Sequence, residues 1–421
     1  MNYKNQYQRK AHQKIDFIFL TLLPQTGLSV REEQVKLSHQ MLDTLLEGKI
    51  ALCDAGVGIG KTYAYLVACV LMRKYAAAMG NGWVCDKRPV VISTSSIALQ
   101  EAIIQEYIPF LSDIFLATGL IGSPLKAIVR KGKEHFVCDN RLEVRLEAVR
   151  DKPKNEAQKK ALFSLKQIYD MDEVANLSSF DRRLVCVPKF CPKECPGRTS
   201  CRYQMYLKQA RDPDIFFQIC NHNYLLADSS HRAKDYKPLL TDYRALIVDE
   251  AHKLPDAARQ MYGKSLCYED ILEICYFLER EHQGMAAKKL KGVFHNLFHI
   301  VSENHMTDEG PASAFRMTEE CAIALEEGKA VLKELADKLR GIAPGWIRNQ
   351  LEKAGEVLTI FTGSSKRYIL HLEQDKGKLP QLCATSRKIP DILSGMLWSQ
   401  GFPAILTSGT LKAGNGFSRT S

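Results

Sequence analysis

The chain has 421 residues, of which 45% are hydrophobic and 25% charged, a composition that excludes a wholly disordered, collagen-like or low-complexity protein. Lysine and arginine number 58 against 48 acidic residues, and the resulting net charge of +10 favours an anionic partner such as a nucleic acid. The best apolar run, residues 15–23, is shorter than the ~20 residues of a membrane helix and contains Asp16. With no signal-peptide pattern at the N-terminus, we expect a cytoplasmic protein without a membrane segment.

Short apolar runs alternate with amphipathic helical patterns over residues 29–130, which predicts an α/β layer built on a parallel sheet. Residues 50–53 and 90–94 indicate buried strands, and residues 63–74 indicate a helix. Further strands are expected at residues 215–220, 245–248 and 404–406, and helical patterns dominate residues 141–169 and 263–370.

A glycine-rich segment separates the first predicted strand from the first predicted helix: Asp54-Ala55-Gly56-Val57-Gly58-Ile59-Gly60-Lys61-Thr62. It is the P-loop pattern, with alanine in the first glycine position. The glycines let successive backbone N–H groups point at phosphate oxygens, and the helix N-terminus adds its dipole. We therefore predict that residues 55–62 bind ATP, with Lys61 reaching the β- and γ-phosphates and Thr62 binding Mg²⁺. The alternative is a glycine-rich turn followed by a chance Lys-Thr.

Two carboxylates follow a second buried strand, within the run Arg244–His252. They stand at the carboxyl end of the strand, where α/β proteins bind their ligands. A P-loop ATPase needs a carboxylate for Mg²⁺ and a group that orients the attacking water. Asp249 is predicted to hold Mg²⁺ through water, and Glu250 to polarise the attacking water. A surface Asp-Glu pair at the start of a helix is the alternative.

Thirteen cysteines in a chain without an export signal favour a metal or cluster site over a disulfide framework. Cys138, Cys191, Cys195 and Cys201 stand in a basic insertion, the last three among prolines and a glycine. Loop thiols at such spacing suit an iron–sulfur cluster. Zinc is an alternative, although the chain has no Cys-x-x-Cys pair, and four reduced structural thiols are another. Cys186 is a fifth candidate ligand.

With the segment Asp249-Glu250-Ala251-His252, the chain resembles superfamily 2 helicases of the DinG/XPD type, over about residues 28–412. Other matching stretches follow in the family's order: Arg31-Glu32-Glu33-Gln34, then Thr94 with Leu99-Gln100-Glu101, then Asn221–Asp228, then Leu406–Leu411 with Gly409 in place of the usual alanine. The resemblance implies that Gln34 reads adenine. It also implies that a set of residues couples the nucleotide site to DNA, namely His252, Thr407, Ser408 and Thr410.

The family resemblance further implies a P-loop (RecA-like) parallel-sheet motor domain with two insertions. The motor domain would comprise residues 1–130, 205–262 and 373–421, the iron–sulfur insertion residues 131–204, and the helical arch insertion residues 263–372. The four cysteines named above would hold a [4Fe–4S] cluster. A second motor domain is expected to be absent, so that the chain is a half-motor for which a second domain or a full-length partner acts in trans.

The implied activity is that of an ATP-dependent DNA helicase in DNA repair or replication, moving 5′→3′ on single-stranded DNA with ATP and Mg²⁺. Two alternatives stay open: a module that binds ATP and DNA without turnover, and a zinc-containing P-loop ATPase that is not a helicase. Phe190 and Tyr203, beside the cysteines, are candidates either for stacking on bases or for packing against the cluster.

Overall fold

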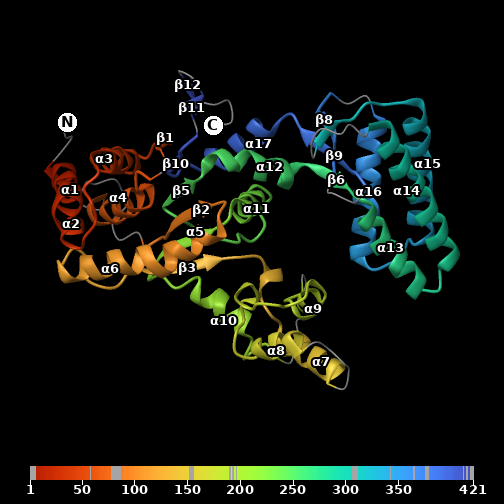
Figure 1. Cartoon of the computed structure of the whole chain (residues 1–421), viewed down its shortest axis with the longest axis horizontal. Coiled ribbons are helices and arrows are strands. Elements are labelled where there is room, and N and C mark those ends of the chain that lie inside the picture. The colour runs from red at the N-terminus through yellow and green to blue at the C-terminus, as the bar shows by residue number, and fades with distance from the viewer. Residues whose placement is uncertain are drawn as a thin grey trace. The chain divides into compact units, whose positions relative to one another are not determined.

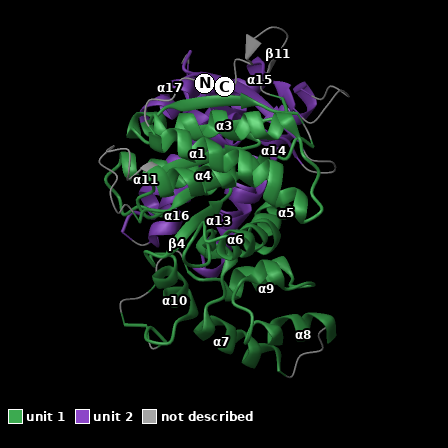
Figure 2. Cartoon of the chain, turned by 90° about the vertical axis from the view of Figure 1, so that its left-hand side faces the viewer, with its two compact units in different colours: residues 1–254, 396–421 green, residues 255–395 purple. Residues whose placement is uncertain are grey.

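Two compact units make up the computed structural model of the chain (Figure 2). Unit 1 comprises residues 1–254 and 396–421, and unit 2 comprises residues 255–395. The structure describes residues 6–56, 58–76, 87–150, 156–188, 191, 194–195, 197–305, 312–341, 343–363, 366–374, 379–410, 412–413 and 416–417.

Unit 1 is built on a six-stranded parallel sheet with the strand order β1-β10-β5-β2-β4-β3 (Figure 1). Its strands are β1 (Ile50–Asp54), β2 (Val90–Thr94), β3 (Lys126–Arg130), β4 (Ile215–Cys220), β5 (Ala245–Asp249) and β10 (Ala404–Ser408). Every residue of β2, β4, β5 and β10 is buried. Continuous apolar runs suit strands of a parallel sheet that is covered on both faces. The predicted α/β class with a parallel sheet is confirmed.

Helices α3 and α4 pack against each other and, with α1, contribute to the main hydrophobic core of unit 1. The helices outside the insertion are α1 (Gln6–Phe17), α2 (Leu23–Gln25), α3 (Glu32–Leu46), α4 (Lys61–Ala76), α5 (Ile97–Ala102), α6 (Ile108–Ala117) and α11 (His222–Ala233). The apolar run at residues 15–23 belongs to this core, where Ile15, Ile18 and Phe19 are buried. None of the described helices is long and apolar enough to cross a membrane.

The cysteine-bearing insertion connects β3 to β4 and has one small hydrophobic cluster of its own and a second that includes Ile128 of β3 and Ile215 of β4. Its helices are α7 (Asp139–Val149), α8 (Glu156–Ser164), α9 (Ser179–Val185) and α10 (Arg202–Gln209). One cluster forms around Leu142, Leu162 and Val185, and the other around Phe136 and Tyr206. Figure 1 shows α7, α8 and α9 gathered close together.

Unit 2 combines helices with a four-stranded antiparallel sheet of order β6-β9-β8-β7, around one apolar core. Its elements are β6 (Lys264–Leu266), α13 (Tyr268–Arg280), α14 (Gly284–His305), β7 (Ala312–Ala314), α15 (Glu319–Lys338), α16 (Gly345–Thr362), β8 (Tyr368–Glu373) and β9 (Gln381–Ser386). Two elements lie at the unit boundaries, α12 (Leu254–Tyr262) and α17 (Ile389–Met396). A two-residue pair, β11 (Lys412–Ala413) with β12 (Gly416–Phe417), follows β10.

The boundaries of unit 2 differ from those of the predicted helical insertion, residues 263–372. The unit runs from residue 255 to residue 395. The two sets of boundaries differ because β9 pairs with both β6 and β8. This pairing places the segment after residue 372 in unit 2. Residues 373–395 were assigned to the final part of the motor domain and lie in unit 2 instead. The helical pattern of the segment gave no sign of the sheet.

Candidate nucleotide site

Residues from three different motifs meet at the carboxyl end of the unit 1 sheet. Strand β10 lies between β1 and β5, so that Asp54 is in register with Ser408, and Thr407 with Asp249. On the other side of β5, Asp249 is in register with Thr94 of β2. Parallel strands bring segments that are far apart in the sequence to one edge, where α/β proteins bind ligands.

The glycine-rich loop is held against the start of α3. Gly58 and Gly60 have φ values of +85° and +88°, which glycine adopts without the steric cost of a side chain. A Cβ atom at Gly60 would lie 2.0 Å from Nε2 of Gln34. Gln34 Nε2 donates a hydrogen bond to the Gly60 carbonyl at 2.8 Å, and Arg31 Nη1 donates one to the Gly58 carbonyl. Val57 falls outside the described residues.

Lys61 is the first residue of α4 and lies between the loop and the acidic pair. Its Nζ donates to the Ala55 carbonyl at 3.3 Å and lies 3.5 Å from Oε1 of Glu250. Glu250 has the left-handed backbone φ of 52°, a conformation that costs energy in a non-glycine residue and is typical of functional sites. Its N–H donates to Asp249 Oδ1 at 2.9 Å. The lysine and both carboxylates therefore form one cluster.

Asp249 is nearly fully buried, and burial raises the pKa of its carboxyl to about 6. The Tyr65 hydroxyl donates a hydrogen bond to Asp249 Oδ2 at 3.2 Å. Sequence reasoning missed Tyr65, although it stands four residues after Lys61, on the same face of a helix. Thr62 and Asp249 offer the oxygen atoms that Mg²⁺ prefers, so these residues fit the predicted ion.

His252 connects the acidic pair to the motif on β10. Its Nδ1 lies 2.7 Å from Ser408 Oγ and 3.2 Å from Glu250 Oε2. Ser408 Oγ in turn accepts a hydrogen bond from the Thr410 N–H at 3.3 Å. The Thr407 hydroxyl is buried and has no hydrogen-bond partner among the described residues. Three of the four predicted coupling residues, His252, Ser408 and Thr410, thus form a continuous chain of contacts that reaches Glu250.

The Asn-His segment is anchored to the same edge of the sheet. The Asn221 side chain caps α11 by accepting a hydrogen bond from the Tyr224 N–H at 2.8 Å. His222 Nδ1 lies 2.8 Å from Ser93 Oγ on β2. Burial lowers the pKa of His222 to about 4, which keeps this imidazole neutral at physiological pH.

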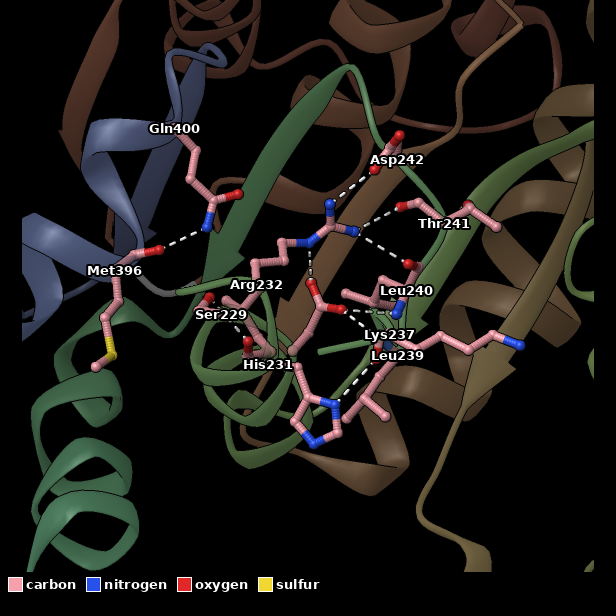
Figure 3. A network of polar contacts seen from close by, with 12 residues as sticks. Ser229, His231, Arg232, Lys237, Leu239, Leu240, Thr241, Asp242, Met396 and Gln400 are labelled. Carbon is pink, nitrogen blue, oxygen red and sulfur yellow. Dashed lines mark hydrogen bonds and ion pairs between the residues drawn. The ribbon is translucent and has the colours of Figure 1, made fainter. Parts of the chain in front are cut away.

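A polar network holds the connection between α11 and β5 (Figure 3). The buried Asp228 carboxylate accepts hydrogen bonds from Arg232 Nε at 2.7 Å and from the N–H groups of Leu239 and Leu240, both at 2.8 Å. Arg232 also donates to Asp242 at 2.7 Å and to the carbonyls of this connection. The network fixes the chain immediately before the strand that ends at Asp249.

A pocket of about 490 Å³ opens beside these residues, within the size range of small-molecule sites. The predicted residues that line it are Gln34, Gly58, Gly60, Lys61, Thr62, Asp249 and Glu250. Sequence reasoning missed an apolar part of the wall, formed by Phe19, Leu23, Leu28, Tyr63, Leu99 and Tyr107. The apolar character of residues 15–23, which include Phe19 and Leu23, is the sequence signal for part of this wall.

Four of the five candidate cysteines are brought near one another in the insertion. Burial, followed by the proximity of Cys138, Cys201 and Cys195, raises the pKa of Cys191, and only Lys133 nearby acts in the opposite direction. Asn140 Nδ2 donates to Cys195 Sγ at 3.3 Å. Four thiols are the donor set of an iron–sulfur cluster, and the cluster stays a prediction.

An ion pair beside two of the cysteines ties their chain segments together. Arg202 Nε donates to Asp139 Oδ1 at 2.9 Å, and these residues directly follow Cys201 and Cys138. Tyr203 is buried, with its ring 5.4 Å from that of Phe136, and is therefore placed for packing rather than for stacking on bases. Phe190 lies outside the described residues.

Comparison with known proteins places the chain beside bacterial helicases. ATP-dependent DNA helicase YoaA of Escherichia coli (strain K12) is 28% identical over 256 residues, which cover 59% of this chain and 37% of YoaA. Probable ATP-dependent helicase YpvA of Bacillus subtilis (strain 168) is 23% identical over 456 aligned positions, covering 98% of this chain and 66% of YpvA. 3'-5' exonuclease DinG of Bacillus subtilis (strain 168) is 27% identical over 278 residues, covering 64% of this chain and 27% of DinG.

The chain thus spans between about a quarter and two thirds of the length of these curated relatives. No family model matches it. Among solved structures, S. tokodaii Xpd4 aligns with a TM-score of 0.43 and 15% identity, over 92% of this chain and 60% of that one. The resemblance to DinG-type helicases that the motifs predicted is confirmed in sequence, at low identity.

Proposed function

We propose that this DinG-like chain binds and hydrolyses ATP with Mg²⁺ as the motor part of an ATP-dependent DNA helicase. The observation that carries the proposal is the cluster of Lys61, Glu250, His252 and Ser408, which come from the start of α4, the segment after β5 and the end of β10 and form continuous contacts beside one pocket. The sequence similarity to proteins named as ATP-dependent DNA helicases supports DNA as the partner.

The roles of the nucleotide-site residues follow from their positions. Lys61 would exchange its contacts with Ala55 and Glu250 for the phosphate oxygens, because a lysine at the start of a P-loop helix is a point charge for them. Asp249 and Thr62 would hold Mg²⁺. Glu250 would orient and deprotonate the attacking water, and it is freed for this role when Lys61 turns to the phosphates.

Coupling to DNA would run through His252. This side chain contacts both Glu250 and Ser408, so a movement of the segment after β10 alters the position of the general base. We propose single-stranded DNA as the ligand that moves this segment. The 5′→3′ direction and a role in repair are what the family resemblance implies.

Cys138, Cys191, Cys195 and Cys201 would hold a [4Fe–4S] cluster. Such a group, when bound, crosslinks the loops of a small insertion. The residues around it act independently of the cluster: Arg202 and Asp139 join the starts of α10 and α7, and Asn140 donates to the Cys195 sulfur.

Hydrolysis of ATP by the 421-residue chain, measured with and without single-stranded DNA, tests the proposal. We expect DNA-stimulated turnover, and a loss of ~10³-fold or more in Glu250→Gln and Lys61→Ala, because phosphoryl transfer depends on positioned charges. Lys49→Ala is the matched control, since this lysine of the same unit is exposed and pairs with Glu47. Its turnover should equal that of the unchanged chain.

Two outcomes would contradict parts of the proposal. Turnover that survives Lys61→Ala in a clean preparation would refute the assignment of the P-loop. Binding of ATP and DNA without any turnover would favour a binding module, or an activity that needs a further domain or partner in trans. Zinc in the insertion without iron or sulfide would favour the zinc-containing ATPase.

A further inference from the structure

Three side chains that commonly bind metals converge in unit 2, outside the nucleotide site and the cysteine insertion. The ligand atoms of His371, Glu373 and Cys383 all lie within 4.8 Å of one another. His371 and Glu373 come from β8 and Cys383 from the neighbouring strand β9 (Figure 1). His371 Nε2 lies 3.3 Å from Glu373 Oε1.

The register of the sheet explains why these side chains meet. His371 pairs directly with Cys383 across the antiparallel strands, and Glu373 stands two residues further along β8. Directly opposed residues and residues two apart share one face of a sheet. The alternate residues Leu372 and Leu382 are buried in the apolar core of unit 2, so the three candidates share the opposite face.

The donor atoms on this face suit a cation. The Glu373 carboxylate contributes a negative charge beside His371 and Cys383, and a thiol that coordinates a divalent metal is deprotonated outright. Cys383 is 6% exposed, whereas the Glu373 side chain is 57% exposed, so an ion has a route from solvent.

We propose that His371, Glu373 and Cys383 form a zinc site. Imidazole, carboxylate and thiolate together are a donor set that suits Zn²⁺, which accepts N, O and S ligands in tetrahedral geometry. The fourth position faces solvent and takes water. Because the ligands come from both strands, the ion crosslinks β8 to β9 and fixes their register. This site is independent of the four cysteines of the insertion and of the proposed nucleotide chemistry.

The test is zinc content, measured by elemental analysis after the 421-residue chain is incubated with zinc sulfate and passed through a desalting column. We expect the unchanged chain to retain one zinc more per chain than Cys383→Ser or His371→Gln. Any zinc that the insertion cysteines hold is the same in the unchanged chain and in the variants, so it does not affect the difference in zinc content between them. Cys275→Ser is the matched control, since this thiol of unit 2 is also buried but contacts the Ala287 carbonyl instead. It should retain the same zinc as the unchanged chain.

If Cys383→Ser folds poorly, a variant with a change at an exposed ligand still tests the proposal. Glu373→Gln alters an exposed side chain, and we expect it to weaken zinc affinity at least tenfold in competition with a chromogenic chelator. Cobalt chloride in place of zinc should give a thiolate-to-cobalt absorption band whose intensity falls by one site in Cys383→Ser and is unchanged in Cys275→Ser. Equal zinc content in the unchanged chain, His371→Gln and Glu373→Gln would overturn the proposal.

Discussion

Glu250, at the edge of the sheet, is held in a backbone conformation that is unfavourable for a residue other than glycine. Glu250 adopts a left-handed backbone, and its side chain meets Lys61 and His252 as a result. Strain of this kind persists only where the surroundings determine it fully. Here the surroundings are the adjacent Asp249, which accepts the Glu250 N–H, and the strand β10.

The lowered pKa of the buried His222 makes the free energy of unfolding depend on pH. Its pKa in the folded chain is about 4, against 6.5 for an ordinary histidine. Between these values the unfolded chain binds a proton that the folded chain does not, so stability falls as pH falls through this window. At about 1.4 kcal/mol per pH unit, we expect this group to contribute a loss of about 2 kcal/mol between pH 7 and pH 5.

Urea unfolding at both pH values, followed by circular dichroism, measures this loss. In His222→Gln, the difference between the free energies of unfolding at pH 7 and at pH 5 should be smaller by about 2 kcal/mol than in the unchanged chain. His299→Gln, which replaces an exposed histidine, is the matched control for the loss of an imidazole. An identical pH dependence in His222→Gln and in the unchanged chain would show that His222 does not remain neutral in the folded state.

Among the elements, the connection between α11 and β5 depends on one buried carboxylate. Asp228→Ala removes the acceptor for Arg232 and for the N–H groups of Leu239 and Leu240. We expect a loss of about 3 kcal/mol in the free energy of unfolding, because a partly buried charge and two N–H groups lose their partner.

Asp242→Ala is the matched control for Asp228→Ala. Asp242 also binds Arg232, but its side chain is 74% exposed, so its removal should cost less than about 1 kcal/mol. Thermal or urea denaturation of the two variants compares them directly. Equal losses would mean that burial of Asp228 does not decide the strength of this network.

The insertion between β3 and β4 is an element whose stability should depend on its cysteines. Its hydrophobic clusters are small, and a segment with little core needs a crosslink. Cys195→Ser should therefore lower the iron content of the purified chain and expose residues 131–204 to protease. Cys186→Ser, the fifth candidate, should retain iron, since the Cys186 thiol donates to the Arg183 carbonyl at 3.4 Å. Loss of iron in Cys186→Ser but not in Cys195→Ser would show that Cys186, rather than Cys195, is a ligand.

At the scale of the whole molecule, each unit has its own apolar core, and the nucleotide pocket is lined by residues of unit 1 alone. Phe294→Ala, in the core of unit 2, should cost about 3–5 kcal/mol of the stability of that unit. The affinity for a fluorescent ATP analogue should change less than twofold.

Leu42→Ala, in the core of unit 1, is the counterpart of Phe294→Ala. It removes packing from α3, the helix that carries Gln34, and should weaken nucleotide binding. Limited proteolysis identifies which unit each substitution loosens. A strong effect of Phe294→Ala on nucleotide affinity would show that the pocket depends on unit 2.

The sequence by itself determined the parallel-sheet class and placed the P-loop, the acidic pair and the segment after β10 at strand ends, because these signals are local. Apolar runs, glycine spacing and adjacent carboxylates are all visible within about ten residues of chain. The four cysteines as cluster ligands stay a prediction, made from their spacing and from the family resemblance.

Only the tertiary structure decided which distant residues meet. The strand order puts β10 between β1 and β5, and so brings Ser408 to His252 across 156 positions of sequence. The contact of Tyr65 with Asp249, the assembly of the pocket's apolar wall and the pairing of His371 with Cys383 depend on packing or register between separate elements, which no local pattern specifies. The boundary of unit 2 was missed for the same reason: the pairing of β9 with β6 and β8 is a long-range property.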